Sequence, residues 1–298
     1  MNKQPIRSVS TKTLLIAYIE YGQGDGWPVI LSHGFPYDAH AFDEVAPLLA
    51  QVGARVLAPY TRGFGETRFL SDGDMRSGQQ AARGRDIVEL ANVLDLERPI
   101  LAGFDWGGNA SCVAAALWPE QVGGLISYAG YDVIDVNAQR EASSPSLERA
   151  YWYQHLFQTE RGRKCLTDHR RDLCRLLWEE WSPGWHFSDA MFERTAPSFD
   201  NPDFVDVVIH CYRHAFGLTK GDPNLQHLEN RLAEKPSISV PAITVDGSRD
   251  PLKPGGTAGH ARMFIGAHEH RVVDSGHDLP QEVPQAFADA IIAVHNWQ

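Results

Sequence analysis

The hexapeptide Gly103-Phe104-Asp105-Trp106-Gly107-Gly108 stands between a short apolar run and an alanine-rich segment. It has the form G-x-nucleophile-x-G, with aspartate at the central position. The glycines allow a tight strand-to-helix turn that raises one side chain above a sheet. Because aspartate is ionised near neutral pH, it could attack a saturated carbon and form an ester without help from a base. The same turn could instead use Asp105 as a helix N-cap, which is the commoner role.

A histidine in a second loop could complete such a site. His277 follows a short apolar run and could deprotonate the water that hydrolyses an ester. It needs a carboxylate to hold its tautomer, and Asp250, which follows the preceding apolar run, fits that role. Asp246 lies closer to the end of that run and is a rival, while Asp274 and Asp278 are weaker alternatives.

The segment His33-Gly34-Phe35-Pro36 follows an early apolar run and could supply backbone donors. The N–H groups of Phe35 and of Trp106, the residue after the nucleophile, could together bind the oxyanion that forms when water attacks the ester. In isolation this segment is an ordinary strand-to-helix loop. Its position relative to Asp105 favours the donor role.

Alternating elements are expected to hold these loops at one edge of a sheet. Apolar runs predict strands, and helix-spaced apolar residues predict helices. We expect strands at 27–32, 55–58, 99–103 and 122–129, and helices at 40–51 and 78–95. After a long interruption, further elements are expected at 238–245 (strand), 256–264 (helix), 271–273 (strand) and from 281 (helix).

The interruption, residues 131–227, shows only helical patterns rich in aromatic and charged residues. Insertions of this kind lie at the carboxyl ends of strands, where open α/β sheets bind ligands. We therefore expect an α/β fold with a core formed by residues 1–130 and 228–298. The helical segment 131–227 is expected to form a lid over the site.

Composition narrows the classes of function. With 27 Lys+Arg and 38 Asp+Glu, the net charge of −11 disfavours binding to nucleic acid or to an anionic membrane surface. The four cysteines show no C-x-x-C spacing and are too few for a disulfide scaffold. The first residues, Met1 to Arg7, lack an apolar region, so we expect no signal peptide and a cytoplasmic location.

These motifs together resemble the α/β-hydrolase-fold epoxide hydrolases, in chain order and over nearly the whole chain. The resemblance rests on His33-Gly34-Phe35-Pro36, Arg62-Gly63-Phe64-Gly65, Asp105-Trp106-Gly107-Gly108, Asp250, Gly276-His277, Tyr153-Gln154-His155-Leu156-Phe157-Gln158 and Tyr212-Arg213. It implies a mostly parallel central sheet flanked by helices, with an all-helical lid. It also implies that Asp105 opens an epoxide while Tyr153 and Tyr212 hydrogen-bond the oxirane oxygen, neutralising the developing alkoxide.

The resemblance implies no cofactor and no metal. The expected partners are water and a small apolar epoxide, because the lid is rich in aromatic residues, and the chain is expected to be a monomer or homodimer. His33, Pro36, Trp152 and Phe157 are the candidate pocket residues. One departure is Phe104, where the family often has histidine, and this could leave His33 without a partner.

The nearest alternative is a dehalogenase with the same Asp-His-Asp machinery. Haloalkane enzymes usually carry Asn after His-Gly, where this chain has Phe35. Haloacid enzymes carry an arginine pair beside the nucleophile, where this chain has Trp106 and Asn109. A serine esterase is disfavoured because G-x-S-x-G is absent from the sequence. His210 and His214 lie one helical turn apart without the glutamate of a zinc protease, so we expect no metal there.

Overall fold

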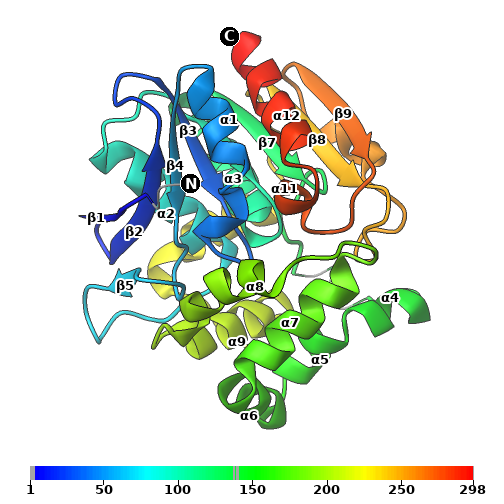
Figure 1. Cartoon of the computed structure of the whole chain (residues 1–298). Helices are drawn as coiled ribbons and strands as arrows, with labels where there is room; N and C mark the ends of the chain where they lie inside the picture. Colours follow the sequence, from blue (N-terminus) through cyan, green and yellow to red (C-terminus); the bar gives the residue numbers. More distant parts are fainter. Residues whose placement is uncertain (1–3, 137, 139–140, 298) are drawn as a thin grey trace.

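The structure is a computed structural model that describes residues 4–136, 138 and 141–297. At its centre lies one sheet in the order β1-β2-β4-β3-β6-β7-β8-β9, with β5 paired to β2 (Figure 1). The strands are β1 (Ile6–Ser10), β2 (Leu14–Tyr21), β3 (Trp27–Ser32), β4 (Ala54–Pro59), β5 (Arg68–Phe69), β6 (Ile100–Gly103), β7 (Gly124–Tyr128), β8 (Ala242–Gly247) and β9 (His268–Val273). From β4 to β9 every neighbouring pair is parallel, which confirms the expected fold class.

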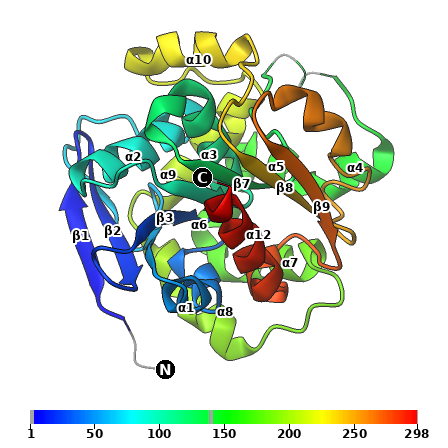
Figure 2. The ribbon, with the colours of Figure 1, turned by 90° about the horizontal axis from the view of Figure 1, so that it is seen from above.

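Helices cover both faces of this sheet. Helices α1 (Val45–Gln51) and α12 (Pro284–Asn296) pack on one face, and α2 (Gln80–Val93) and α3 (Trp106–Leu117) pack on the other (Figure 2). The short α11 (Leu279–Glu282) precedes α12. Central strands such as β6 and β7 are buried throughout because both of their faces are covered.

Several elements differ from the sequence-based expectation. The antiparallel strands β1, β2 and β5 were not predicted, although the apolar run of β2 is a strand signal. The strand expected at 238–245 begins only at Ala242, after Pro241, and Ile238 instead forms an isolated bridge with Phe264. The helix expected at 40–51 is divided into a 3₁₀ turn at Ala39–Phe42 and α1. The helix expected near 256–264 is the 3₁₀ turn Ala258–Met263.

A group of helices follows β7 and lies beyond the carboxyl ends of the parallel strands, in green in Figure 1. They are α4 (Pro145–Ala150), α5 (Trp152–Phe157), α6 (Glu160–Asp168), α7 (Arg170–Trp181), α8 (Asp189–Thr195) and α9 (Phe204–Ala215). We call α4 to α9 the cap. Helix α10 (Gln226–Ala233) packs on α2 and α3 instead, so residue 227, the predicted end of the lid, falls inside a helix that contacts the core. The division at residues 131 and 227 stays a prediction.

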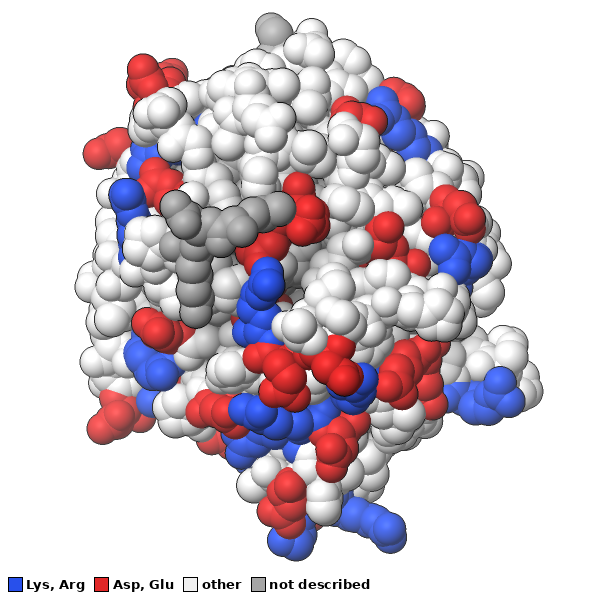
Figure 3. All heavy atoms as spheres, in the orientation of Figure 1, with Lys and Arg blue, Asp and Glu red and all other residues white. Residues whose placement is uncertain are grey.

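The cap surface carries charges of both signs side by side (Figure 3). Arg175, for example, pairs with Asp189 at 2.6 Å, and Arg171 pairs with Asp200 at 3.0 Å. On this face, basic side chains therefore form no continuous patch of the kind that binds phosphate backbones. Among the described residues, no helix has the length and apolar character needed to cross a membrane.

Candidate active site

Asp105 lies at the turn between β6 and α3 with φ of +52°, a conformation that few non-glycine residues adopt. The turn is tight, since a Cβ on Gly107 would collide with the carbonyl oxygen of Ser32. Asp105 immediately precedes α3, but its side chain accepts no capping hydrogen bond. The interpretation of Asp105 as a side chain that caps the N-terminus of α3 is therefore wrong. The carboxylate faces the helices α4 to α9 instead.

The predicted histidine lies between this carboxylate and a second one. His277 places Nε2 3.3 Å from Oδ2 of Asp105 and Nδ1 2.9 Å from Oδ2 of Asp250. The rival Asp246 is engaged elsewhere, because it accepts hydrogen bonds from the amide and hydroxyl of Thr257. Asp250, rather than Asp246, is thus the carboxylate that holds the imidazole.

The two carboxylates control the protonation of His277. Burial lowers the pKa of this imidazole, but the negative charges of Asp250 and Asp105 outweigh burial and raise the pKa to about 10. The pKa of Asp250 is lowered, because although burial raises it, His277 and the other hydrogen-bond donors prevail. At neutral pH the site therefore holds an imidazolium between two carboxylates.

One backbone amide contacts the Asp105 carboxylate, and a second lies next to it in the chain. The amide of Phe35 donates to Oδ1 of Asp105 at 2.8 Å, from the loop that follows β3. Gly34 makes this approach possible, since a Cβ there would collide with the Asp105 carboxylate. The amide of Trp106, at the start of α3, has no backbone acceptor among the described residues. Of the two predicted oxyanion donors, the Phe35 amide contacts Asp105 and the Trp106 amide belongs to the residue that follows it.

The cap contributes two tyrosines from different helices. Tyr153 of α5 and Tyr212 of α9 are buried, and their rings lie 5.4 Å apart at a right angle. Gln154 donates to the hydroxyl oxygen of Tyr153 at 2.9 Å, which leaves the Tyr153 proton free to point elsewhere. Burial and the charge of Asp105 raise the pKa of both hydroxyls well above 10, so both stay protonated donors at neutral pH.

A cavity of about 160 Å³ brings these groups together. Asp105, His277, Tyr153 and Tyr212 all line it. The remaining wall is formed by Arg83, Trp106, Asn109, Tyr128, Ala129, Asp132, Ile134, Tyr151, Gln154, Cys211, Ala215, Leu252 and Lys253. The expectation of an apolar pocket is wrong for part of this wall, because three charged side chains outside the catalytic group contribute to it.

The four candidate pocket residues do not line this cavity. Both ring nitrogens of His33 are bonded to backbone, at Gly34 O (2.9 Å) and Thr61 N (3.0 Å), and burial lowers its pKa to about 4. His33 is thus a neutral structural residue with partners, despite Phe104. Phe157 is fully buried, with its ring 5.4 Å from that of Tyr212.

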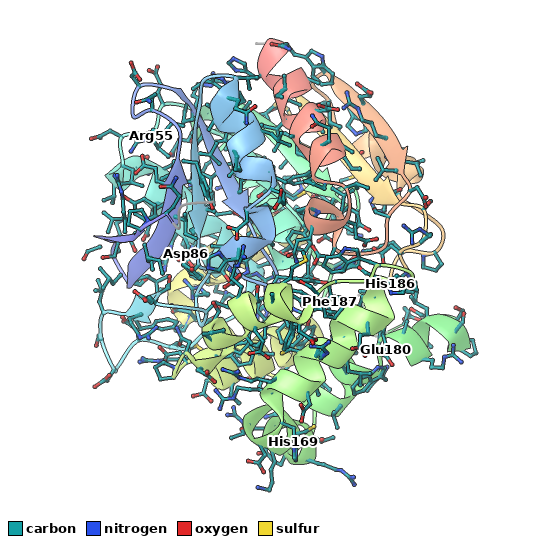
Figure 4. The ribbon with its side chains drawn as sticks, in the orientation of Figure 1. Arg55, Asp86, His169, Glu180, His186 and Phe187 are labelled. Carbon is teal, nitrogen blue, oxygen red and sulfur yellow. The ribbon has the colours of Figure 1, made fainter. Side chains whose placement is uncertain are left out.

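The other two candidates are held by cap side chains. The carbonyl of Pro36 accepts from the indole of Trp178 at 2.9 Å. The indole of Trp152 donates to Glu180, a residue on the outer side of α7 (Figure 4). Phe187 lies at the junction between cap and core in the same view and packs on Trp178. These aromatic residues therefore build the cap and its contact with the core, behind the cavity wall.

Sequence reasoning missed two residues that position the site. Tyr128, at the end of β7, directs its hydroxyl to Oδ2 of Asp250 (2.9 Å) and to the carbonyl of Gly276 (2.7 Å). The carbonyl of Trp181, at the end of α7, accepts from the amide of His277 at 3.0 Å. A tyrosine ending a strand is the only signal that the sequence offered for Tyr128.

No group of three or more possible metal ligands occurs among the residues that the structure describes. His210 and His214 stack with ring centres 5.7 Å apart. His210 is bonded to the backbone amide of Gly78 and the carbonyl of Lys220.

Comparison with known proteins identifies the family of this fold. A model of the alpha/beta hydrolase fold family matches residues 28–281. The chain belongs to the α/β-hydrolase fold family. A crystal structure from Klebsiella pneumoniae, named a candidate epoxide hydrolase, superposes on this α/β-hydrolase with a TM-score of 0.95. The two sequences are 41% identical, and the match covers 98% of this chain and 97% of that one.

Curated relatives of this α/β-hydrolase bear two kinds of name. Epoxide hydrolase A of Mycobacterium tuberculosis is 27% identical over 96% of this chain and 95% of its own. A fluoroacetate dehalogenase of a Burkholderia species is 32% identical over 135 residues, which span 45% of this chain and less than half (43%) of the relative. The resemblance to epoxide hydrolases is thus confirmed, while dehalogenases also appear among the relatives.

Proposed function

We propose that this α/β-hydrolase opens an epoxide to a vicinal diol through a covalent ester on Asp105. The observation that carries the proposal is the pair of protonated cap tyrosines, Tyr153 and Tyr212, in the same cavity as Asp105. Ring opening develops negative charge on the oxirane oxygen, and hydroxyl donors stabilise that charge. Departure of a halide requires no such proton donor. The relatives named epoxide hydrolases also support this assignment.

In the first step Oδ2 of Asp105 attacks a ring carbon while Oδ1 stays bonded to the Phe35 amide. The carbon–oxygen bond of the ring breaks, and its electron pair passes to the oxygen, which takes a proton from a tyrosine hydroxyl. The tyrosinate then regains its proton from the imidazolium of His277, directly or through water, which leaves the imidazole neutral. The product of this step is a neutral hydroxyalkyl ester.

Ester formation removes the charge of Asp105, one of the two carboxylates that raise the pKa of His277. The pKa of the imidazole therefore falls, and the neutral ring accepts a proton from water. The resulting hydroxide attacks Cγ of Asp105, and the amides of Phe35 and Trp106 bind the oxyanion. Collapse of this intermediate breaks the bond between Cγ and the substrate oxygen, and that oxygen takes the proton of the newly formed carboxyl group, directly or through His277. The diol leaves, Asp105 is a carboxylate again and His277 an imidazolium, so one water is consumed for each epoxide.

Intact-protein mass measurement on His277→Gln tests the proposal. Without its base the enzyme should stall at the ester, so incubation with epoxides should add the whole mass of the epoxide. A gain equal to an alkyl group after loss of halide, seen only with haloalkanes or haloacids, would instead establish a dehalogenase. The double variant Asp105→Asn/His277→Gln is the matched control and should gain no mass with either panel.

The dehalogenase remains the second candidate because of the Burkholderia relative. One wall residue, Arg83, could attract a haloacid carboxylate. Its terminal nitrogens, however, are already bonded to Asn109 (2.6 Å), Cys211 (2.7 Å) and the carbonyl of Gly78. This engagement makes Arg83 a poor carboxylate clamp, which favours the epoxide. Location in the cytoplasm and a monomeric or homodimeric state stay predictions.

A further inference from the structure

Two charged side chains of the cavity wall have no part in the proposed chemistry. Asp132 follows β7, and Lys253 lies three residues after Asp250 in the loop that follows β8. Their Nζ and Oδ1 atoms lie 3.7 Å apart, which is too far for a good hydrogen bond. Within the described part of the chain, neither head group has a closer polar partner.

The backbone of this pair is fixed. The backbone carbonyl of Asp132 accepts from the side-chain amide Nδ2 of Asn109 on α3, at 2.5 Å. The amide of Lys253 donates to the carbonyl of Asp250 at 3.3 Å, and its carbonyl accepts from Gly256 at 2.9 Å. The backbones that carry the two head groups are therefore anchored where β7 and β8 end, close to Asp105 and Asp250.

The charges lining the site balance, which bears on the charge of the substrate. Arg83, Lys253 and the imidazolium of His277 offset Asp105, Asp132 and the bonded Asp250. Burial and the charge of Asp105 raise the pKa of Asp132 to about 6, against the opposing effect of Lys253, so it remains an acceptor at neutral pH. Because these positive and negative charges are equal in number, the cavity wall offers no net attraction to a charged ligand. It still places one strong hydrogen-bond donor, Lys253, beside one strong acceptor, Asp132.

A hydroxyl group matches such a pair, since it both accepts and donates a hydrogen bond. We propose, resting on the epoxide chemistry above, that the substrate is an epoxide whose carbon chain carries a hydroxyl group. The ammonium of Lys253 donates a hydrogen bond to the hydroxyl oxygen, and the carboxylate of Asp132 accepts the hydrogen bond that this hydroxyl donates. The pair thus determines specificity for a neutral, hydroxylated epoxide over a hydrocarbon one.

The test compares 1,2-epoxyalkanes of graded chain length that end in a methyl, hydroxyl or carboxylate group. At the chain length that reaches the pair, wild-type kcat/KM for the hydroxyl compound should exceed that for the methyl compound by about tenfold or more, as hydrogen bonds to charged groups give. Lys253→Met and Asp132→Asn should each remove most of this preference. Circular dichroism checks that both variants fold, and the readout is the ratio of the two kcat/KM values rather than either rate alone.

Lys164→Met is the matched control, because Lys164 forms an exposed ion pair with Asp168 on the cap surface and should leave every ratio unchanged. Preference for the methyl compound at all lengths overturns the inference and leaves the proposed function intact. Preference for the carboxylate compound overturns it in favour of a cationic subsite. An equal loss on all substrates in Lys253→Met assigns the lysine a structural role and also overturns it. Failure of every epoxide, with no adduct on His277→Gln, overturns the proposed function itself.

Discussion

The imidazole of His277 bridges two carboxylates from different loops, with Nε2 3.3 Å from Asp105 and Nδ1 2.9 Å from Asp250. Asp105 is the proposed nucleophile and loses its charge when the ester forms, whereas Asp250 keeps its charge throughout. In the proposed mechanism the histidine carries a proton while Asp105 is charged and becomes a base once Asp105 is esterified. This proposal sets the order of the two half-reactions, because the base is inactive until the ester has formed.

The same relationship predicts how stability depends on pH. The folded pKa of His277, about 10, lies above the unfolded value of about 6.5. Its contribution to stability is fully present below pH 6.5 and is lost as the pH rises toward 10. Urea unfolding at several pH values should show that wild type loses more stability across this window than His277→Gln, by on the order of a few kcal/mol. Parallel pH profiles for the two proteins would contradict the paired imidazolium.

The cap tyrosines should act as partly redundant donors. Tyr153→Phe or Tyr212→Phe alone should leave partial epoxide hydrolysis, since the other hydroxyl still reaches the oxirane oxygen, and the double variant should retain almost none. Loss of one transition-state donor typically costs about 100-fold or more in rate. Steady-state kinetics would measure both effects. Tyr131→Phe is the control, because its hydroxyl donates to the carbonyl of Pro236 away from the cavity. Full activity in the double variant would contradict the role of both tyrosines.

Gly34 should tolerate no side chain, although it takes no part in the chemistry. Gly34→Ala places a methyl group against the Asp105 carboxylate and should displace either the carboxylate or the Phe35 amide. We expect kcat/KM to fall by about 100-fold, as small misplacements of reacting groups produce. Gly24→Ala is the control, since a Cβ there meets no atom within 4 Å. Wild-type kinetics in a folded Gly34→Ala protein would show that the donor geometry is unimportant.

Tyr128 should hold the carboxylate of Asp250 in position. Tyr128→Phe removes the hydroxyl that donates to Asp250 and contacts the carbonyl of Gly276, so the carboxylate should hold His277 less firmly. Hydrolysis of the ester should slow by about tenfold, the effect of one hydrogen bond to a charged group, while formation of the ester changes little. Rapid-quench mass measurements of the ester would separate the two steps. Slower ester formation with unchanged hydrolysis would contradict this positioning role.

Local patterns in the sequence were sufficient to predict the tight turn at Asp105 and most of the parallel strands. The glycines around Asp105 mark a turn in which a Cβ would collide with neighbouring backbone. Central strands appear as plain apolar runs because both of their faces are covered. The antiparallel strands β1 and β5 were missed because β1 is largely exposed and β5 has only two residues, so neither has a clear apolar pattern. The strand at 238–245 was misplaced because its apolar residues continue across Pro241 without a change in pattern.

The sequence by itself determined which side chains could carry out the chemistry and in what order they follow along the chain. Only the tertiary structure decided between Asp250 and Asp246, because one follows β8 and the other lies near its end, and only loop geometry brings Asp250 to His277. It also decided that cap aromatics such as Trp152 and Phe157 pack behind the cavity, and that Lys253 and Asp132 face into it. Contacts between distant segments depend on how whole elements pack, and no local pattern of residue types records that packing.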